Sequence, residues 1–313
     1  MPTPIFVVGV GRSGTSLLMA MLNSHPSIGM LPETFFILRH ICQRTGSREQ
    51  LVERIASDEY LRRLPFDVAD ILGCRKQCGV LSPADIHREI FAEYARIKEV
   101  PFVGEKAPKY VELLPVLDAL YHDCVVIHVI RDPRDVLISR RKAEWSAGYS
   151  DYAHVLAYES QLTYGRSTGA SLFGRRYLEV IYEQLISNPA DVLRGIAETL
   201  RVEYSDVMLD FGKSGEELLS ASERQWKKET TGPLLANNYG KWKSALSDRE
   251  VKFIEDACPT VFDSGLYERS FGIAGGSWLV RSAFRAAGLA YKKRMTFRNC
   301  RVVRNVRRDR QAE

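Results

Sequence analysis

A glycine-rich loop near the start of the chain combines residue types that can bind an anion. The apolar residues Ile5 to Val8 lead into Gly9, Gly11 and Gly14, and between and after these glycines stand Arg12, Ser13, Thr15 and Ser16. Glycine lets the backbone approach an anion closely, and the N–H groups that open a helix donate to its oxygens. The hydroxyl and guanidinium groups add further donors. The alternative interpretation is a tight turn between a strand and a helix that binds nothing.

The same loop lacks the lysine of an ordinary NTP-binding loop. Such loops end in Gly-Lys-Ser/Thr, which binds the β- and γ-phosphates and Mg²⁺. Here the corresponding residues are Ser13-Gly14-Thr15, and Arg12 is the sole cation of the loop. The absence of the lysine and of its Mg²⁺ site fits transfer of a sulfuryl group. Such a group carries less negative charge than a γ-phosphoryl group, so fixed cations and N–H donors can stabilise it without a metal. We therefore expect no metal site.

A second candidate anion site begins at Arg131, directly after the apolar run Cys124 to Ile130. Ligands of open α/β sheets bind at the carboxyl ends of strands, where Arg131 lies, and Ser139 follows on the next helix. A guanidinium and a hydroxyl can together bind a phosphate. Asp132 fits a helix N-cap, whereas Arg134 fits a solvated surface charge. Two anion sites on one sheet indicate a nucleotide phosphorylated at two separated positions; 3′-phosphoadenosine-5′-phosphosulfate (PAPS) has that shape and ATP does not.

Short apolar runs alternate with helical patterns along much of the chain. The expected strands are Ile5–Val8, Ser27–Leu31, Phe102–Gly104, Cys124–Ile130 and Tyr177–Tyr182. The expected helices include Thr15–Ser24, Tyr110–Tyr121, a segment from Pro133 to about Glu144, and Pro189–Leu200. Strands that alternate with helices predict parallel pairing. The predicted fold is α/β, a P-loop-type three-layer architecture with a central, mainly parallel sheet flanked by helices.

Segments in the same order resemble motifs of the PAPS-dependent sulfotransferase family. They are Val8–Ser16, Val129–Ser139, Tyr182–Pro189 and Tyr239–Ser247. The first resembles the family's 5′-phosphosulfate loop, the second its 3′-phosphate motif, and the last the loop that closes over the nucleotide. The resemblance covers roughly residues 4 to 268. It is strongest to the protein-tyrosine sulfotransferase branch and its bacterial relatives, through residues 11–26, Pro32-Glu33-Thr34 and Tyr182-Glu183-Gln184-Leu185.

The resemblance implies three catalytic residues. Glu33 would be the general base that takes the acceptor's proton, Lys106 would contact the bridging oxygen of the donor, and Arg12 would stabilise charge on the phosphosulfate. The alternatives are an exposed turn residue for Glu33 and a surface lysine for Lys106. Histidine is a competing base, but His25 fits a packing position and His128 lies inside a strand. His122 stands in a loop without a motif partner.

The resemblance also assigns the donor-binding residues. These are Gly11, Arg12, Ser13, Gly14, Thr15, Ser16, Arg131, Ser139, Tyr182, Ser222, Lys241 and Trp242. Tyr182 and Trp242 are candidates to pack against adenine, with plain core residues as the alternative. Ser222 matches a serine that contacts the sulfuryl group, in a loosely similar segment.

The implied reaction moves a sulfuryl group from PAPS to a hydroxyl or amine and leaves adenosine 3′,5′-bisphosphate (PAP). The acceptor stays open among a peptide tyrosine, a glycan, a lipid and another small molecule. Two other functions remain as alternatives, a nucleotide-binding relative without transferase activity and a P-loop kinase. The sequence contains no nucleic-acid recognition motif, so we expect no specific nucleic-acid partner, and a homodimer is compatible with it.

The charge of the chain is concentrated at its end. The formal net charge is +5, yet residues 281–310 hold eleven Lys or Arg and one acid, so the remainder is slightly acidic.

We expect a sulfotransferase domain over residues 1–270, with a mostly helical substrate-side insertion at about 35–100, and a basic, partly helical tail over 271–313. The basic amphipathic segment Trp278–Met295 predicts either contact with an anionic membrane or acidic partner, or a helix packed on the domain before a disordered end.

The remaining features concern cysteines and location. Cys74 and Cys78 stand one helical turn apart, which fits a disulfide, half a metal site or two unrelated thiols. The N-terminus does not resemble a signal peptide, and no apolar run is long enough to span a bilayer. These observations predict a cytoplasmic protein with reduced thiols, or one held peripherally at a membrane.

Overall fold

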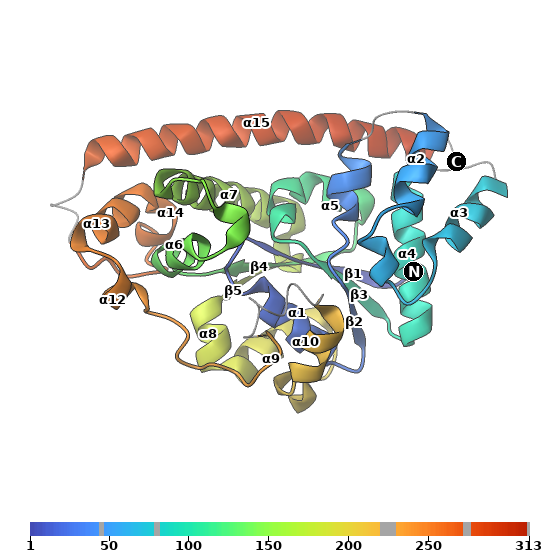
Figure 1. The fold of residues 1–313 in the computed structure, drawn as a ribbon, viewed down its shortest axis with the longest axis horizontal. Coiled ribbons are helices and arrows are strands. Elements are labelled where there is room, and N and C mark those ends of the chain that lie inside the picture. Colours follow the sequence, from blue (N-terminus) through green and yellow to red (C-terminus); the bar gives the residue numbers. More distant parts are fainter. Residues whose placement is uncertain (44–46, 78–81, 220–229, 272–276, 312–313) are drawn as a thin grey trace.

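The structure is a computed structural model that describes residues 1–43, 47–77, 82–219, 230–271 and 277–311. Figure 1 shows a central sheet between two layers of helices, with a long C-terminal helix across the outside of one layer. The strands are β1 Thr3–Gly9, β2 Ile28–Leu31, β3 Phe102–Lys106, β4 Val125–Ile130 and β5 Tyr177–Ile181. They pair in the order β2-β3-β1-β4-β5, and every pair is parallel. The predicted α/β three-layer fold is confirmed.

Alternate side chains of β1 enter separate cores. Ile5 and Val7 pack with α1 (Thr15–Asn23), α8 (Tyr182–Ser187) and α9 (Pro189–Leu200), together with α10 (Gly212–Leu218). Phe6 and Val8 pack on the other face with α4 (Pro83–Lys98) and α5 (Leu114–Leu120). Successive side chains of a strand point to opposite faces, so a strand covered by helices on both sides reads as a continuous apolar run.

All the expected strands are present, with ends that differ from the expected ones by at most two residues, and α9 has the predicted bounds. Two helices differ. The helix that begins at Pro133 (α6, Pro133–Arg141) ends before Glu144, because its backbone tightens into a turn in which Ala143 N–H donates to Arg140 O at 2.9 Å. The segment from Tyr110 to Tyr121 divides into a 3₁₀ helix, η3 (Pro108–Leu113), and α5. Pro115 has no N–H to donate into a preceding turn and suits the first turn of a new helix.

The pattern analysis passed over α7 (Asp151–Phe173), the helix that covers β4. Ser150 caps it by accepting a hydrogen bond from Ala153 N–H at 3.3 Å. The segment from residue 35 to 100 carries η1 (Ile37–Ile41), α2 (Arg48–Ala56), η2 (Leu61–Arg63), α3 (Val68–Gln77) and α4. The other elements are η4 (Glu144–Ser146), η5 (Gly174–Arg176), η6 (Asp206–Leu209), α12 (Trp242–Ala245), α13 (Asp248–Ala257), α14 (Pro259–Phe262) and α15 (Trp278–Gln311).

The basic tail forms one helix, α15, that packs against α5, α7 and α13. The helix continues to Gln311, so the interpretation that its basic end lacks structure is wrong. Among the described helices, α15 included, none combines the length and the apolar composition that crossing a bilayer requires. Cys78 and the side chain of Cys74 lie outside the described part of the chain.

Glu159 on α7 is a buried carboxyl that gives folding a pH dependence. Its Oε1 accepts hydrogen bonds from Thr260 N–H at 3.1 Å and from the Thr260 hydroxyl at 2.6 Å. Burial nevertheless raises the pKa of Glu159 from 4.5 to about 7, because desolvation of the charged form exceeds the gain from these bonds. The folded protein therefore binds this proton more tightly than the unfolded chain does.

Stability contributed by the protonated Glu159 is fully present below pH 4.5 and is lost as the pH rises through about 7. We expect the Glu159→Gln variant to lose this pH dependence. Between pH 4.5 and pH 7 the unfolding free energy of the native chain, relative to that of the variant, should fall by about 3 kcal/mol. Urea unfolding of both proteins across this range measures the difference, and parallel curves would contradict the assignment.

Candidate active site

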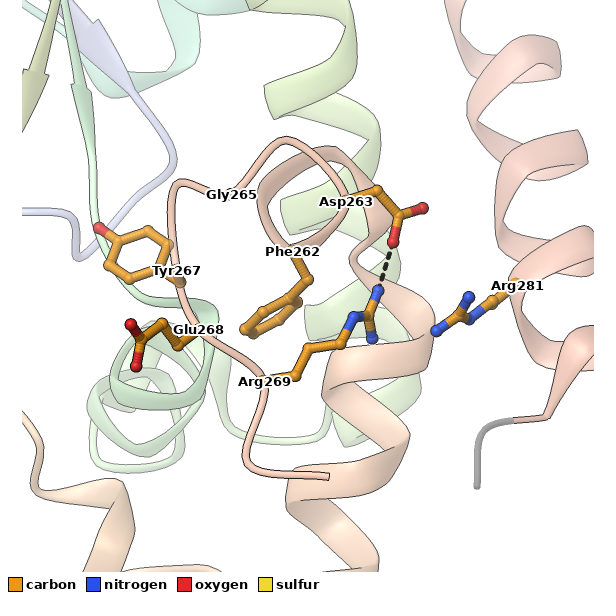
Figure 2. A pocket seen from close by; sticks show the side chains of 7 residues that line it. All are labelled: Phe262, Asp263, Gly265, Tyr267, Glu268, Arg269 and Arg281. Atoms are coloured by element: carbon orange, nitrogen blue, oxygen red, sulfur yellow. Dashed lines mark hydrogen bonds and ion pairs between the residues drawn. The ribbon is translucent and has the colours of Figure 1, made fainter. Parts of the chain in front are cut away.

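A cavity of about 1050 Å³ opens at the carboxyl ends of β1, β2, β3 and β4. Residues from both predicted anion sites line it, and all three predicted catalytic residues are among them: Gly11, Arg12, Gly14, Thr15, Ser16, Glu33, Lys106 and Arg131. Parallel strands end at one edge of the sheet, so loops that are distant in sequence meet there. A second cavity, of about 690 Å³, lies around Phe262 and Arg269 and holds none of the predicted residues (Figure 2). The cavity at the strand ends is the candidate site.

The glycine loop is held in a shape that presents its donors. Gly14 immediately precedes α1 with a φ of 92°, and no side chain caps the helix there. A Cβ on Gly14 would lie 2.2 Å from Cδ2 of Tyr182, so the loop rests directly on that ring. The Ser13 hydroxyl is buried and makes no hydrogen bond within the described residues. A buried hydroxyl without a partner beside an open helix N-terminus fits an anionic oxygen of a ligand.

The two anion motifs are joined by direct contacts. Arg12 Nε donates to Ser139 Oγ at 2.9 Å, and Arg131 Nη1 donates to the carbonyl of Arg12 at 3.2 Å. The Arg131 guanidinium lies 4.2 Å from the centroid of the Tyr182 ring, and its buried Nε makes no hydrogen bond within the described residues. Arg12 itself has a φ of 80°, a left-handed conformation that costs energy for a residue with a Cβ. Such strain persists where the surrounding contacts hold it.

Glu33 and Lys106 form an ion pair inside the cavity. The Lys106 side chain is 1% exposed and that of Glu33 is 12% exposed, so the surface interpretations of both residues are wrong. Lys106 ends β3 opposite Val7 of β1, and Glu33 follows β2, which pairs with the other edge of β3. A buried ammonium group requires a counter-charge, and Glu33 supplies it. A bound anion near Lys106 would compete with Glu33 for that cation.

The residues next to Glu33 and Lys106 belong to a buried hydrogen-bond network that helps to position this ion pair. Thr34, the neighbour of Glu33, donates its hydroxyl to Oε1 of Glu105, the neighbour of Lys106. Oε2 of Glu105 accepts a hydrogen bond from the Tyr110 hydroxyl at 3.1 Å and lies 3.4 Å from His87 Nε2. Burial raises the pKa of Tyr110, which therefore stays a donor. The network links the turn after β2 to the end of β3, and the sequence offered no sign of it because its members are spread from residue 34 to residue 110.

Arg134 is not a surface charge. Its side chain is buried, and it donates to Asp132 and to Oε1 of Glu255 at 2.7 Å. The guanidinium also lies 3.9 Å from the centroid of the Trp242 ring. Asp132 acts as the predicted N-cap and accepts from Arg134 N–H at 2.9 Å. Arg134 is buried because α13, which carries Glu255, covers this turn of α6.

Five predicted donor-binding residues are not among those that line the cavity: Ser13, Ser139, Tyr182, Lys241 and Trp242. Tyr182 is buried beneath the glycine loop, and its hydroxyl accepts from Asn238 Nδ2 at 2.8 Å. The backbone N–H of Trp242 donates to Asp135 Oδ1 at 3.0 Å, so the segment that carries Lys241 and Trp242 is tied to α6. Ser222 lies outside the described residues.

Arg140 is a site residue that the sequence analysis missed. It directly follows Ser139, lines the cavity and is 6% exposed. Its Nε donates to Gly11 O and its Nη1 to His154 O, both at 3.3 Å. Burial lowers the pKa of Arg140 to about 10, and no carboxylate of the described residues lies within ion-pair distance of its guanidinium. A buried cation whose hydrogen bonds within the described residues all go to carbonyls suits a cavity that receives an anion.

Aromatic side chains form the outer wall of the cavity: Phe35, Tyr60, Trp145 and Tyr149. His154 also lines it, and burial lowers the pKa of its imidazole. His128 lies elsewhere, bonded to the Tyr177 hydroxyl at 2.6 Å, and burial lowers its pKa to about 3. His25 packs below α1, where its Nδ1 accepts from Ser27 N–H at 3.0 Å. Within the described residues, no cluster of three or more His, Cys, Asp or Glu side chains could hold a metal.

The sequence is similar to those of known proteins. The profile of the sulfotransferase family matches residues 4–206. A putative protein-tyrosine sulfotransferase of Caenorhabditis briggsae is 26% identical over 264 residues, covering 82% of this chain and 86% of its own. Protein-tyrosine sulfotransferase 2 of Gallus gallus is 27% identical over 255 residues, covering 76% of this chain, which spans only 62% of that protein.

The solved structures show a similar fold. The sulfotransferase domain of the Synechococcus PCC 7002 olefin synthase superposes with a TM-score of 0.59 at 23% identity, over 85% of this chain and 96% of that one. The sulfotransferase domain from the curacin biosynthetic pathway gives a TM-score of 0.55 at 21% identity, over 79% and 93%. On the match of the family profile to most of its length, this chain belongs to the sulfotransferase family.

Proposed function

We propose that the chain transfers a sulfuryl group from PAPS to a hydroxyl or amine acceptor in line, with Glu33 as general base. One observation carries the proposal: a buried carboxylate–ammonium pair, Glu33 with Lys106, faces the same cavity as the glycine loop and Arg131. A base, a cation and two anion-binding elements within one cavity match what transfer between oxygen atoms requires. The buried atoms Ser13 Oγ and Arg131 Nε, which make no hydrogen bond to the described part of the chain, fit the phosphate oxygens of the donor.

Each residue has a distinct task in this proposal. Glu33 accepts the proton of the acceptor as its oxygen or nitrogen bonds to sulfur. Lys106 moves from Glu33 to the oxygen that bridges sulfur and phosphorus, and stabilises the charge that develops there when the sulfur–oxygen bond breaks. Arg12, held by Ser139, and the N–H groups of the loop stabilise the sulfuryl oxygens. PAP and the sulfated acceptor are the products.

Several classes of acceptor are compatible with the proposed reaction. The two relatives described above are named as protein-tyrosine sulfotransferases, and the aromatic wall of Phe35, Tyr60, Trp145 and Tyr149 can pack against a ring or another apolar body. A glycan, a lipid or another small molecule remains compatible with a cavity of about 1050 Å³. A screen of peptides, glycans, lipids and phenols with radiolabelled donor identifies the acceptor.

Ligand-induced stabilisation separates this proposal from a kinase. We expect PAP without metal to raise the unfolding free energy by roughly 2.7 kcal/mol at about 100 times its Kd, since it binds only the folded protein. Mg-ATP should produce no comparable shift, because the loop lacks the P-loop lysine. Differential scanning fluorimetry with each ligand is the measurement. A shift with Mg-ATP and none with PAP would refute the donor assignment, and PAP binding without transfer to any acceptor in the screen would favour a nucleotide-binding relative.

A further inference from the structure

The long helix α15 has two faces of different character. The inner face is anchored on the domain by the buried side chains of Met295, Asn299, Val302 and Val306. Asn299 Nδ2 donates to Glu112 O at 2.6 Å and to the Tyr164 hydroxyl at 2.9 Å. Figure 1 shows the helix across the outside of the layer that contains α5 and α7, with its outer side turned away from the sheet. Its rotation is thus fixed, and the same residues always face outward.

Large apolar side chains project from the outer part of this helix. Trp278 is 71% exposed, Leu279 61%, Leu289 67% and Phe297 81%. Such residues are normally scattered singly on a protein surface, whereas four of them here share one helix. With 3.6 residues per turn, Leu279, Lys293, Phe297 and Arg304 fall on one side of the helix, opposite Met295 and Val302.

Cations accompany these apolar side chains. Lys293, Arg294, Arg301, Arg304, Arg307 and Arg308 are all exposed. No ion pair joins any of the six to a carboxylate of the described residues, in contrast to Arg281 and Arg285, which pair with Asp256 and Asp263. Residues 281–310 contain a single acid, Asp309. The outer face is the side of α15 that carries Leu279, Lys293, Phe297 and Arg304. It therefore offers uncompensated positive charge beside exposed apolar groups.

We propose that the outer face of α15 binds the surface of an anionic lipid membrane. Exposed aromatic and aliphatic groups beside Lys and Arg match the boundary between acyl chains and anionic headgroups, and each cation near such a surface strengthens binding. A nucleic acid would use the cations but would leave Leu279 and Leu289 in water. The helix lies along the membrane plane, because its inner face stays packed on the domain and it lacks the composition to cross the bilayer. The proposal is independent of the sulfuryl-transfer reaction.

Co-sedimentation of the full chain with vesicles tests it, without donor or acceptor. We expect binding to vesicles of phosphatidylcholine with phosphatidylserine, at least about tenfold weaker binding to phosphatidylcholine alone, and loss of binding at high salt. The Arg301→Gln/Arg304→Gln variant should bind anionic vesicles at least about tenfold more weakly. The Leu279→Ser/Phe297→Ser variant should also bind more weakly, but without a change in the salt dependence.

A matched control removes the same charge elsewhere. Lys98 and Arg175 are exposed cations on other elements, and the Lys98→Gln/Arg175→Gln variant should bind as the native chain does. Far-UV circular dichroism verifies that α15 remains folded in every variant. Equal loss in the control and the α15 variants, or no preference for anionic vesicles, would overturn the proposal. Binding to DNA or polyglutamate that exceeds binding to anionic vesicles would overturn it as well, in favour of a nucleic acid or an acidic protein.

Discussion

Turnover of the Glu33→Gln variant is expected to fall by about 10²- to 10⁴-fold, the usual contribution of a positioned general base. Glutamine keeps the size of the side chain and an oxygen that Lys106 Nζ can contact, but it accepts no proton. Affinity for PAP should stay equal or become tighter, because the change removes the carboxylate that competes with the ligand for the buried ammonium group of Lys106. Transfer assays with radiolabelled donor and isothermal titration with PAP measure the two quantities separately.

The control for this variant is Glu59→Gln. Glu59 lines the same cavity but is exposed and forms no ion pair within the described residues, so its loss should leave turnover within about twofold. A Glu33→Gln enzyme that retained most of its turnover would exclude Glu33 as the base. His154, the imidazole on the cavity wall, would then be the residue to replace next.

The Gly14→Ala variant is expected to lose PAP affinity by about 10²-fold and to be destabilised. A Cβ at this position would lie 2.2 Å from Cδ2 and 2.5 Å from Cε2 of Tyr182, a buried ring that cannot move without disturbing Arg131 above it. The glycine loop would have to shift, and small displacements of positioned groups have effects of this size. The positive φ adds about 1–2 kcal/mol of backbone cost and the overlap about 1–3 kcal/mol.

Gly148 offers a matched control for the backbone cost. Its φ is 91° against 92° for Gly14, and a Cβ there would meet nothing within 4 Å. Gly148→Ala should therefore destabilise by the conformational cost alone, about 1–2 kcal/mol in urea unfolding, with PAP affinity within about twofold of the native value. If both variants lost PAP affinity equally, the ring of Tyr182 would not be what holds the loop.

The local elements of this fold could be predicted from short stretches of sequence. Four apolar residues before Gly9 indicated β1, the Asp132-Pro133 pair indicated the start of α6, and the spacing of apolar residues from Pro189 to Leu200 indicated α9. These signals are local because a strand, a cap and an amphipathic helix depend on neighbours a few residues away. The helix α7 was not predicted from the sequence, because its apolar residues point in several directions, toward the sheet, α13 and α15.

The sequence alone predicted an anion-binding site, since the types and order of residues in the glycine loop and after Arg131 are local facts. Only the tertiary structure decided how the charged groups pair. The sheet order places β3 between β2 and β1, which brings Glu33 to Lys106 and ties Thr34 to Glu105. Packing of α13 on α6 buried Arg134, and packing of α7 against α6 buried Arg140. A charge acquires its role from partners far along the chain, and the order of parallel strands, which no short stretch encodes, selects those partners.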